Sequence, residues 1–349
     1  MLYRLILKLR HKAFDKGRRK SSSACLPTVC VGNVTVGGTG KTPHTELLLR
    51  MLQEHQGLAV LSRGYGRKSK GYLRVEPEGK AMDYGDEPLQ IARKFPDVKV
   101  AVDANRLEGC EKLKEEGAKL VVLDDAFQHR KLKADLNIVL VNFSNPVFED
   151  KLLPFGRLRD LPERIFKADI IIVSKCPEDI RPDEKAEFCS GLHLSNYDPS
   201  SCEATCPDGH KIQVLFSYIT YMEPQMVFPE GDHRYVYAQR VVLMSGIAKD
   251  RRLAMHLRPN YTLAREMYFA DHHVFSRKDL NKVEKALAKT GASAVITTEK
   301  DAQRLRSLSY ISGYLKERLI EVPIQACLTN SVEEELLLSA LLKVQQSRI

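Results

Sequence analysis

The chain has 349 residues, enough for about two domains, and its 43% hydrophobic and 28% charged residues are ordinary for a globular protein. This composition excludes collagen-like, low-complexity and intrinsically disordered proteins. The net charge of +9 does not indicate nucleic acid as a partner, because residues 1–20 hold eight of the 54 Lys and Arg but one of the 45 Asp and Glu, which leaves the remainder nearly neutral.

The first predicted element is a basic amphipathic helix within residues 1–20. One face of it carries the apolar side chains Leu2, Leu5, Ile6 and Leu9. The opposite face carries Arg4, Lys8, His11, Lys12 and Asp15. Such a helix either docks on an anionic membrane or packs on its own domain, and the periodicity alone leaves both open. No segment reaches the roughly 20 apolar residues that a membrane span needs.

Strand and helix patterns then alternate through the first two thirds of the chain. Strands are predicted within residues 27–36, 57–66, 97–106, 118–127, 134–142 and 168–175, and helices within residues 44–55, 88–95 and 107–117. The strands are nearly continuous β-branched runs, which indicates an α/β fold of the P-loop NTPase type, with a parallel sheet covered by helices on both faces.

A second, smaller α/β lobe is expected after an irregular, turn-rich stretch at residues 195–235. We place the boundary near residue 205, so that a membrane-docking helix (1–20), a P-loop domain (21–205) and a C-terminal lobe (206–349) follow one another. Cys202, Cys206 and His210 in this stretch have a spacing that suggests a metal, but a second ligand pair is missing, so reduced thiols are expected.

The sequence VGNVTVGGTGKTP, residues 31–43, predicts a phosphate-binding loop between a strand and a helix. The usual spacing places a glycine where Thr35 stands, but the glycines at 37, 38 and 40 can make the same turn. Lys41 would reach the β- and γ-phosphates, and the Thr42 hydroxyl would bind Mg²⁺. The predicted nucleotide site comprises Gly37, Gly38, Thr39, Gly40, Lys41 and Thr42.

Carboxylates at the ends of two strands complete the predicted chemistry. Asp124 and Asp125 end an apolar strand, as the Mg²⁺-binding carboxylate of P-loop enzymes does. Asp103 ends another strand, where it would act as the base for an attacking hydroxyl or cap the following helix; the local sequence leaves both open. In FADHHVFS, His272 or His273 would face a cleft between the lobes, or both are structural.

Several segments together resemble the family of bacterial tetraacyldisaccharide 4′-kinases, the lipid A 4′-kinases. They are VGNVTVGGTGKTP, LSRGYGRKSKG, YGDEP, VAVDANR, LDDAFQHRKLKADLNIVLVN, LLPFGRLRD, LMSGIAKD, FADHHVFS and ITTEKDAQRL. The resemblance implies transfer of the γ-phosphate of ATP to the 4′-hydroxyl of a tetraacyldisaccharide 1-phosphate, at the cytoplasmic face of the inner membrane and with no protein partner required.

The same resemblance implies roles for individual residues. Asp103 matches the family's base, with His272 as its partner from the second lobe. The family's Arg-Glu pair at the membrane-facing cleft falls on Arg159 and Asp160, where the acid is one methylene shorter. An acylated acceptor also favours membrane docking, with Leu2, Leu5, Ile6 and Leu9 inserted.

Two rival functions fit part of the same sequence. A P-loop GTPase or metal-insertion chaperone is suggested by ADIIIVSKCPED, in which Ser174 and Lys175 resemble a guanine-reading NKxD motif; Pro177 replaces its aspartate, which favours ATP. A non-enzymatic, nucleotide-gated membrane-binding module is the other rival, and it leaves Asp103 and the two histidines unexplained.

Overall fold

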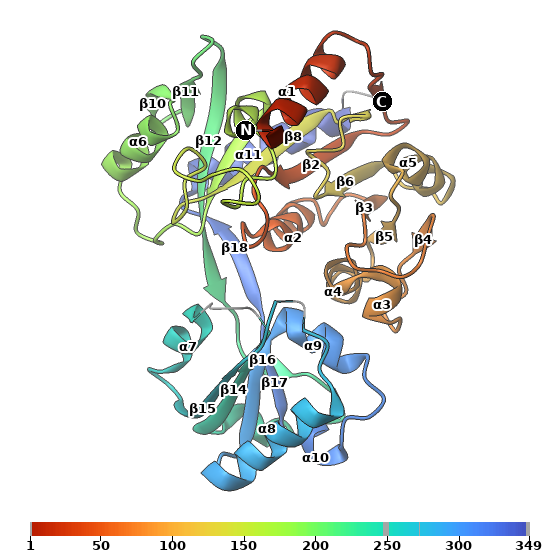
Figure 1. The fold of residues 1–349 in the computed structure, drawn as a ribbon, viewed down its shortest axis with the longest axis vertical. Helices are drawn as coiled ribbons and strands as arrows, with labels where there is room; N and C mark the ends of the chain where they lie inside the picture. The colour runs from red at the N-terminus through yellow and green to blue at the C-terminus, as the bar shows by residue number, and fades with distance from the viewer. Residues whose placement is uncertain (1, 247–250, 272, 347–349) are drawn as a thin grey trace.

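The computed structural model describes residues 2–246, 251–271 and 273–346. They form a large lobe and a small lobe, joined by the antiparallel strands β12 (Lys211–Tyr221) and β18 (Ile324–Leu328) (Figure 1). The α/β architecture expected from the alternating pattern is confirmed.

The large lobe is built on an 11-stranded sheet. Its further strands are, in spatial order around β12, β10 (Ser195–Asp198), β11 (Glu203–Thr205), β9 (Ile170–Ser174), β8 (Leu136–Asn142), β2 (Thr28–Asn33), β6 (Leu120–Asp124), β3 (Leu58–Ser62), β5 (Lys99–Val102) and β4 (Leu73–Arg74). The neighbours from β12 to β5 are all parallel. Their carboxyl ends therefore share one edge of the sheet, where α/β proteins bind their ligands.

Helices cover both faces of this sheet, as its β-branched strands require. One face packs on α2 (Lys41–Met51), α4 (Asp86–Lys94) and α11 (Ser331–Gln346). The other packs on α5 (Arg106–Glu115), α6 (Pro182–Gly191) and the 3₁₀ helix η1 (Pro162–Lys167). Side chains of β2 alternate between the two cores, with Cys30 on one side and its neighbours Val29 and Val31 on the other.

Shorter elements complete the large lobe. They are α1 (Leu2–Asp15), α3 (Ala81–Tyr84) and the strand pair β1 (Ser22–Ser23) and β7 (Leu132–Lys133).

The small lobe is a five-stranded sheet of its own. Its strands are, in order, β13 (Gln225–Met226), β17 (Leu319–Val322), β16 (Ala294–Thr298), β14 (Arg240–Ser245) and β15 (Thr262–Tyr268). Its helices are η2 (His233–Tyr237), α7 (Arg252–Leu257), α8 (Arg277–Thr290), α9 (Glu299–Arg306) and α10 (Gly313–Lys316). α8, α9 and α10 pack on one face, and α7 packs on the other.

The division between the lobes differs from the boundary expected at residue 205. β12 pairs with β9 through Gln213–Phe216 and then with β18 through Ser217–Tyr221, so it leaves the large lobe only near its end. After β18 the chain returns, and Leu337 and Leu341 of α11 are buried against the large sheet. The small lobe is thus inserted between β12 and β18, and α11 belongs to the large lobe because its apolar face completes that core.

Charged side chains also join the lobes where α4 meets α9. Arg304 pairs with Asp86 at 2.6 Å, and both side chains are nearly buried. Lys94 lies 2.7 Å from Glu46 of α2 and 3.1 Å from Glu299 of α9. Lys94 of α4 therefore links the small lobe to α2, the helix that follows the glycine-rich loop.

Candidate functional site

The loop between β2 and α2 has a backbone that requires its glycines. Gly37, Gly38 and Gly40 have φ angles of 76°, 27° and 84°, in the region that side chains disfavour. Between them, Thr39 is buried, and its hydroxyl accepts a hydrogen bond from Asn33 Nδ2 at 2.6 Å. Thr35, at the position of the missing glycine, is bridged to the segment at Leu158, so the turn begins after it.

Lys41 begins α2 and faces a charged pair at the end of β6. Its Nζ lies 3.8 Å from Asp125 Oδ1, and Arg159 NH1 donates to Asp125 Oδ2 at 3.0 Å. Burial acts to raise the pKa of Asp125, but the hydrogen bond and charge of Arg159, together with Lys41, hold it below its ordinary value. Asp125 is therefore ionised at neutral pH and holds both cations at the loop.

Asp124 lies deeper, with 1% of its surface exposed. The hydroxyl groups of Ser62 and Thr45 donate to its two oxygens at 3.2 and 3.4 Å. Burial, followed by the charges of Glu87 and Asp125, raises the pKa of Asp124 to about 7. A cation beside it would favour its ionised form.

Asp103 follows β5 on the same sheet edge and is 2% exposed. Its Oδ1 accepts a hydrogen bond from the backbone N–H of Asn105 at 2.9 Å, whereas its buried Oδ2 has no hydrogen-bond partner among the described residues. The residue before α5 is Asn105, and no side chain caps that helix. The alternative that the Asp103 side chain caps that helix therefore receives no support, and its Oδ2 is a buried carboxylate oxygen without a partner among the described residues.

Of the two adjacent histidines, only His273 lies in the part of the chain that the structure describes; His272 lies outside it. His273 Nε2 contacts Asp279 at 3.0 Å, and its ring stacks on Phe269 at a centroid distance of 4.8 Å. These contacts hold His273 within the small lobe.

Arg159 and Asp160, expected together at a substrate site, face different neighbours. Arg159 reaches Asp125, as described above. Asp160 is 1% exposed, and its Oδ1 lies 2.6 Å from His11 Nε2 of α1 and accepts the Leu161 N–H at 2.8 Å. In this structure Asp160 Oδ1 therefore holds α1 on the large lobe, whereas its buried Oδ2 has no hydrogen-bond partner among the described residues.

Helix α1 has a buried face and an exposed apolar face. Leu7, His11 and Phe14 are buried against the large lobe. The exposed face carries Leu2, Leu5, Ile6 and Leu9, which are 71%, 54%, 51% and 58% exposed. His11, expected on the polar solvent-facing side, is instead buried, because Asp160 supplies its hydrogen bond. No helix in the described residues is long and apolar enough to cross a bilayer.

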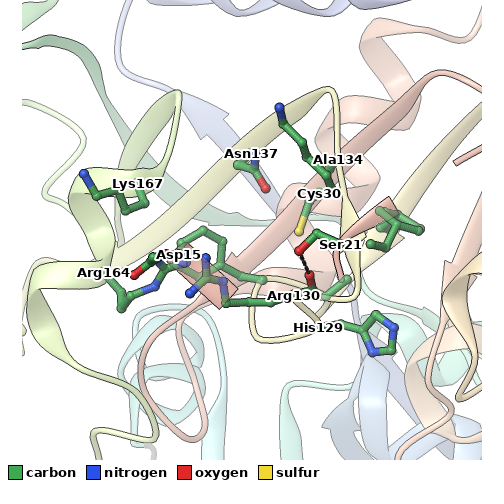
Figure 2. Close-up of a pocket in the computed structure, with 14 residues that line it drawn as sticks. Asp15, Ser21, Cys30, His129, Arg130, Ala134, Asn137, Arg164 and Lys167 are labelled. Atoms are coloured by element: carbon green, nitrogen blue, oxygen red, sulfur yellow. Dashed lines mark hydrogen bonds and ion pairs between the residues drawn. The ribbon is translucent and has the colours of Figure 1, made fainter. Parts of the chain in front are cut away.

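A cavity of 290 Å³ lies beside the end of α1 (Figure 2). Its apolar lining includes Cys30, Leu123, Phe127 and Leu132. Its cationic lining comprises Arg130, Lys133, Arg164 and Lys167, with Asp15 as the acid. The charged lining of this cavity is thus predominantly basic.

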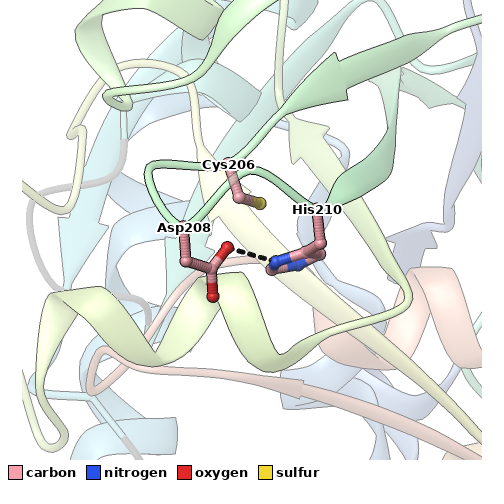
Figure 3. A group of neighbouring side chains, drawn as sticks. All are labelled: Cys206, Asp208 and His210. Carbon is pink, nitrogen blue, oxygen red and sulfur yellow. Dashed lines mark hydrogen bonds and ion pairs between the residues drawn. The ribbon is translucent and has the colours of Figure 1, made fainter.

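The spacing of Cys206 and His210 does bring possible metal ligands together. With Asp208, their ligand atoms lie within 4.8 Å of one another on the turn before β12 (Figure 3). However, Lys167 is paired with Asp208 at 3.4 Å, and burial, with the charge of Asp208, raises the pKa of Cys206 to about 11. Cys202 points elsewhere, toward the Pro199 carbonyl, and all eight cysteines are free thiols.

Three polar residues at the loop were not singled out from the sequence. Asn33 ends β2, Ser62 ends β3, and His44 follows the loop lysine within α2. His44 Nδ1 donates to the Gly40 carbonyl at 2.7 Å, so its Nε2 accepts the hydroxyl proton of Ser217 at 2.8 Å. The sequence signal that could have identified them was their position, at the carboxyl end of a predicted strand for Asn33 and Ser62 and next to the GKT triplet for His44.

Known proteins resemble this chain along nearly its whole length. The sequence profile of a family described as tetraacyldisaccharide-1-P 4′-kinase matches residues 1–342. Tetraacyldisaccharide 4′-kinases of Phocaeicola vulgatus and Bacteroides fragilis are 37% and 39% identical to it, over 93% of this chain in both cases and 88% and 86% of theirs. The crystal structure of LpxK from Aquifex aeolicus in complex with ATP is 26% identical, with a TM-score of 0.72 over 98% of this chain and 96% of that one.

Proposed function

Because the chain belongs to the family of tetraacyldisaccharide-1-phosphate 4′-kinases, we propose that the sheet edge formed by β2, β5 and β6 is the catalytic centre of such an enzyme. The protein is an ATP-dependent kinase that phosphorylates the 4′-hydroxyl of tetraacyldisaccharide 1-phosphate in lipid A biosynthesis. The observation that carries our assignment of the centre is Asp103, whose buried Oδ2 has no partner among the described residues. Asp103 lies at the end of β5, on the sheet edge from which the glycine-rich loop also leaves β2.

The loop glycines and Lys41 bind the phosphates of ATP. Gly37, Gly38 and Gly40 turn backbone N–H groups toward an anion at the beginning of α2, where the helix dipole adds to the attraction. Lys41, whose ammonium group lies beside Asp125, neutralises charge at the β- and γ-phosphates. ATP binding would draw Lys41 from that carboxylate toward the phosphates.

The donor set beside the loop fits Mg²⁺. Asp124, Asp125 and the hydroxyl of Thr42 offer oxygen ligands, which this ion prefers, and the pKa of Asp124 is raised by burial and by the charges of Glu87 and Asp125, which a bound cation would offset. A bound Mg²⁺ would supply charge neutralisation to the triphosphate. Ser62 and Thr45 hold the Asp124 carboxylate in place through hydrogen bonds to its two oxygens.

Asp103 acts as the general base. Its Oδ1 is fixed by the backbone N–H of Asn105, which leaves Oδ2 to accept the proton of the attacking 4′-hydroxyl. His272 of the small lobe would tune and orient this carboxylate. The assignment of His272 rather than His273 is supported by the contacts that hold His273 to Asp279 and Phe269.

Helix α1 places the enzyme at the cytoplasmic surface of the inner membrane, as a peripheral protein. The exposed stripe of Leu2, Leu5, Ile6 and Leu9 inserts into the acyl boundary, while nearby cations meet anionic headgroups. Arg159 contacts Asp125 beside the loop, and its neighbour Asp160 contacts His11 of α1. Of this pair, we assign the substrate contact to Arg159 and the anchoring of α1 to Asp160.

The test is transfer of label from γ-labelled ATP to detergent-solubilised tetraacyldisaccharide 1-phosphate, with wild-type protein and the Lys41→Ala variant. Label on the lipid that falls at least about a hundredfold in the variant supports this centre. Full transfer by Lys41→Ala would place catalysis elsewhere. A GTPase is distinguished by competition with unlabelled GTP.

A further inference from the structure

A second lysine reaches the phosphate loop from β9. Lys175 directly follows Ser174, the last residue of that strand. A Cβ atom built on Gly38 would lie 3.7 Å from Lys175 Nζ, and one built on Gly40 would lie 4.0 Å from Lys175 Cε. The stem and the ammonium group of Lys175 therefore lie over the loop glycines, although the residue is 135 positions further along the chain.

The backbone at this position is held in an unfavourable conformation. Lys175 has a φ of 63°, in the left-handed region, which costs a residue with a side chain roughly 1–2 kcal/mol. Hydrogen bonds on both sides maintain it: the Ser174 hydroxyl donates to the Thr39 carbonyl at 2.8 Å, and the Cys176 N–H donates to the Ser217 carbonyl at 3.0 Å. Such strain persists where surrounding contacts enforce it, and it concentrates at binding sites.

The order of strands determines which half of ATP lies near Lys175. β6 and β5, which carry Asp124 and Asp103 at their ends, lie on one side of β2; β8 and β9 lie on the other. The γ-phosphate must face the carboxylates, because the reaction occurs there. The nucleoside half of ATP therefore extends from the loop toward β9 and Lys175.

We propose that Lys175 is a nucleotide-positioning residue whose ammonium group binds the ribose of ATP while Lys41 binds the phosphates. This inference rests on the proposed function of the loop and extends it to the other half of the nucleotide. It also gives a role to a segment that resembled a guanine-reading motif: Pro177 removes the carboxylate that would read the base, but the lysine is kept in place by Thr39 and Ser217.

The charge of Lys175 is also felt by the neighbouring histidine. Burial first, and then the positive charge of Lys175, contribute to lowering the pKa of His44 to about 4, against the opposing hydrogen bond to Gly40. His44 is consequently neutral and keeps its hydrogen bonds to the Gly40 carbonyl and the Ser217 hydroxyl. Of His44 and Lys175, it is therefore Lys175 that brings a positive charge to the loop at neutral pH.

The experiment is calorimetric titration of the full chain with ATP and, separately, with inorganic tripolyphosphate, which has no ribose. Lys175→Met removes the ammonium group and keeps the stem. We expect this variant to bind ATP about tenfold more weakly, because one charged hydrogen bond is lost. Its affinity for tripolyphosphate should stay within about twofold of wild type. Lys211→Ala, which changes an exposed lysine paired with Glu203, is the matched control and should change neither affinity.

Lys175→Asn provides a second variant if Lys175→Met does not fold, because asparagine tolerates the left-handed backbone. Unchanged ATP affinity, or equal losses of ATP and tripolyphosphate, would overturn the proposal. The Lys41→Ala variant distinguishes failure of this inference from failure of the proposed function. It should weaken the binding of both ATP and tripolyphosphate. If it weakens the binding of neither, the loop is not the phosphate site.

Discussion

The phosphate-loop edge of the large sheet and the exposed face of α1 are opposite kinds of surface. At the sheet edge, Asp103 and Asp124 are almost fully buried and are held by defined hydrogen bonds. On the exposed face of α1, the side chains of Leu2, Leu5, Ile6 and Leu9 are each more than half exposed. Chemistry needs fixed groups and membrane contact needs a broad apolar area, so the proposed function assigns the two tasks to separate residues and predicts that mutation separates them.

Two consecutive residues connect these surfaces. Arg159 reaches Asp125 at the phosphate site, and Asp160 holds His11 of α1. The position of α1 is thus tied to the catalytic edge through one short stretch of backbone.

The largest expected effect is on the catalytic side of this comparison. Asp103→Asn keeps the side chain's size and its hydrogen bond to the Asn105 N–H but removes the base, so turnover should fall about 10²- to 10⁴-fold. ATP affinity should stay within about twofold, because Asp103 does not bind the phosphates. Initial rates and calorimetry measure the two quantities. A variant that turns over at the wild-type rate would remove Asp103 from the mechanism.

The second effect belongs to α1. The double variant Leu5→Glu/Ile6→Glu replaces two exposed apolar side chains, each worth about 1.5–3 kcal/mol when buried in lipid, so affinity for vesicles of phosphatidylethanolamine and phosphatidylglycerol should fall at least about tenfold. Co-sedimentation measures it. Met255→Glu changes an equally exposed apolar residue of the small lobe and should bind as wild type. Equal vesicle binding by all three proteins would contradict membrane docking by this face.

The third effect tests the junction. His11→Ala leaves the buried Asp160 without its side-chain partner and should lower the free energy of unfolding by about 1–3 kcal/mol, measured by denaturant titration. His210→Ala breaks a comparable His–Asp pair that is largely exposed, and it should cost less than about 0.5 kcal/mol. If the two variants lose the same stability, the buried pair is no anchor for α1.

The smallest effect concerns Glu46 of α2, which Lys94 links to Glu299 of the small lobe. Burial, followed by the charge of Glu299, raises the pKa of Glu46 to about 7, although Lys94 acts against it. A carboxyl with a raised folded-state pKa favours the folded state at low pH and loses this contribution as pH rises toward 7. When the pH rises from 5.5 to 6.5, the free energy of unfolding of wild type should therefore fall by about 1 kcal/mol relative to that of Glu46→Gln. Parallel stability curves for the two proteins would show that Glu46 titrates normally.

Sequence patterns predicted the glycine turn between β2 and α2 well because its geometry is local. The left-handed backbone at Gly37, Gly38 and Gly40 demands glycine, and a strand before them and a helix after them complete the pattern. The apolar stripe of α1 was equally readable, since helical periodicity places Leu2, Leu5, Ile6 and Leu9 on one face.

Contacts between distant residues could not be read in this way. His11 and Asp160 are 149 positions apart; the sequence placed His11 on the polar face of a helix and Asp160 at a substrate site, and neither segment indicates that they pair. The lobe boundary was misplaced for a related reason: the turns at residues 195–235 resemble a linker, but β11 and β12 form an antiparallel hairpin that extends the large sheet. The sequence of α11 also does not indicate that this helix packs on the large lobe, because an amphipathic pattern shows that one face is buried but not which sheet buries it.

The most direct test of separate catalytic and membrane surfaces is one kinetic comparison. Phosphate transfer to tetraacyldisaccharide 1-phosphate is measured with the lipid in detergent micelles and again in vesicles, for wild type, Asp103→Asn and Leu5→Glu/Ile6→Glu. We predict that Asp103→Asn is slow in both, whereas the α1 variant is slow in vesicles and near wild type in micelles. An α1 variant that is equally slow in both would mean that this face takes part in catalysis, and the separation would be wrong.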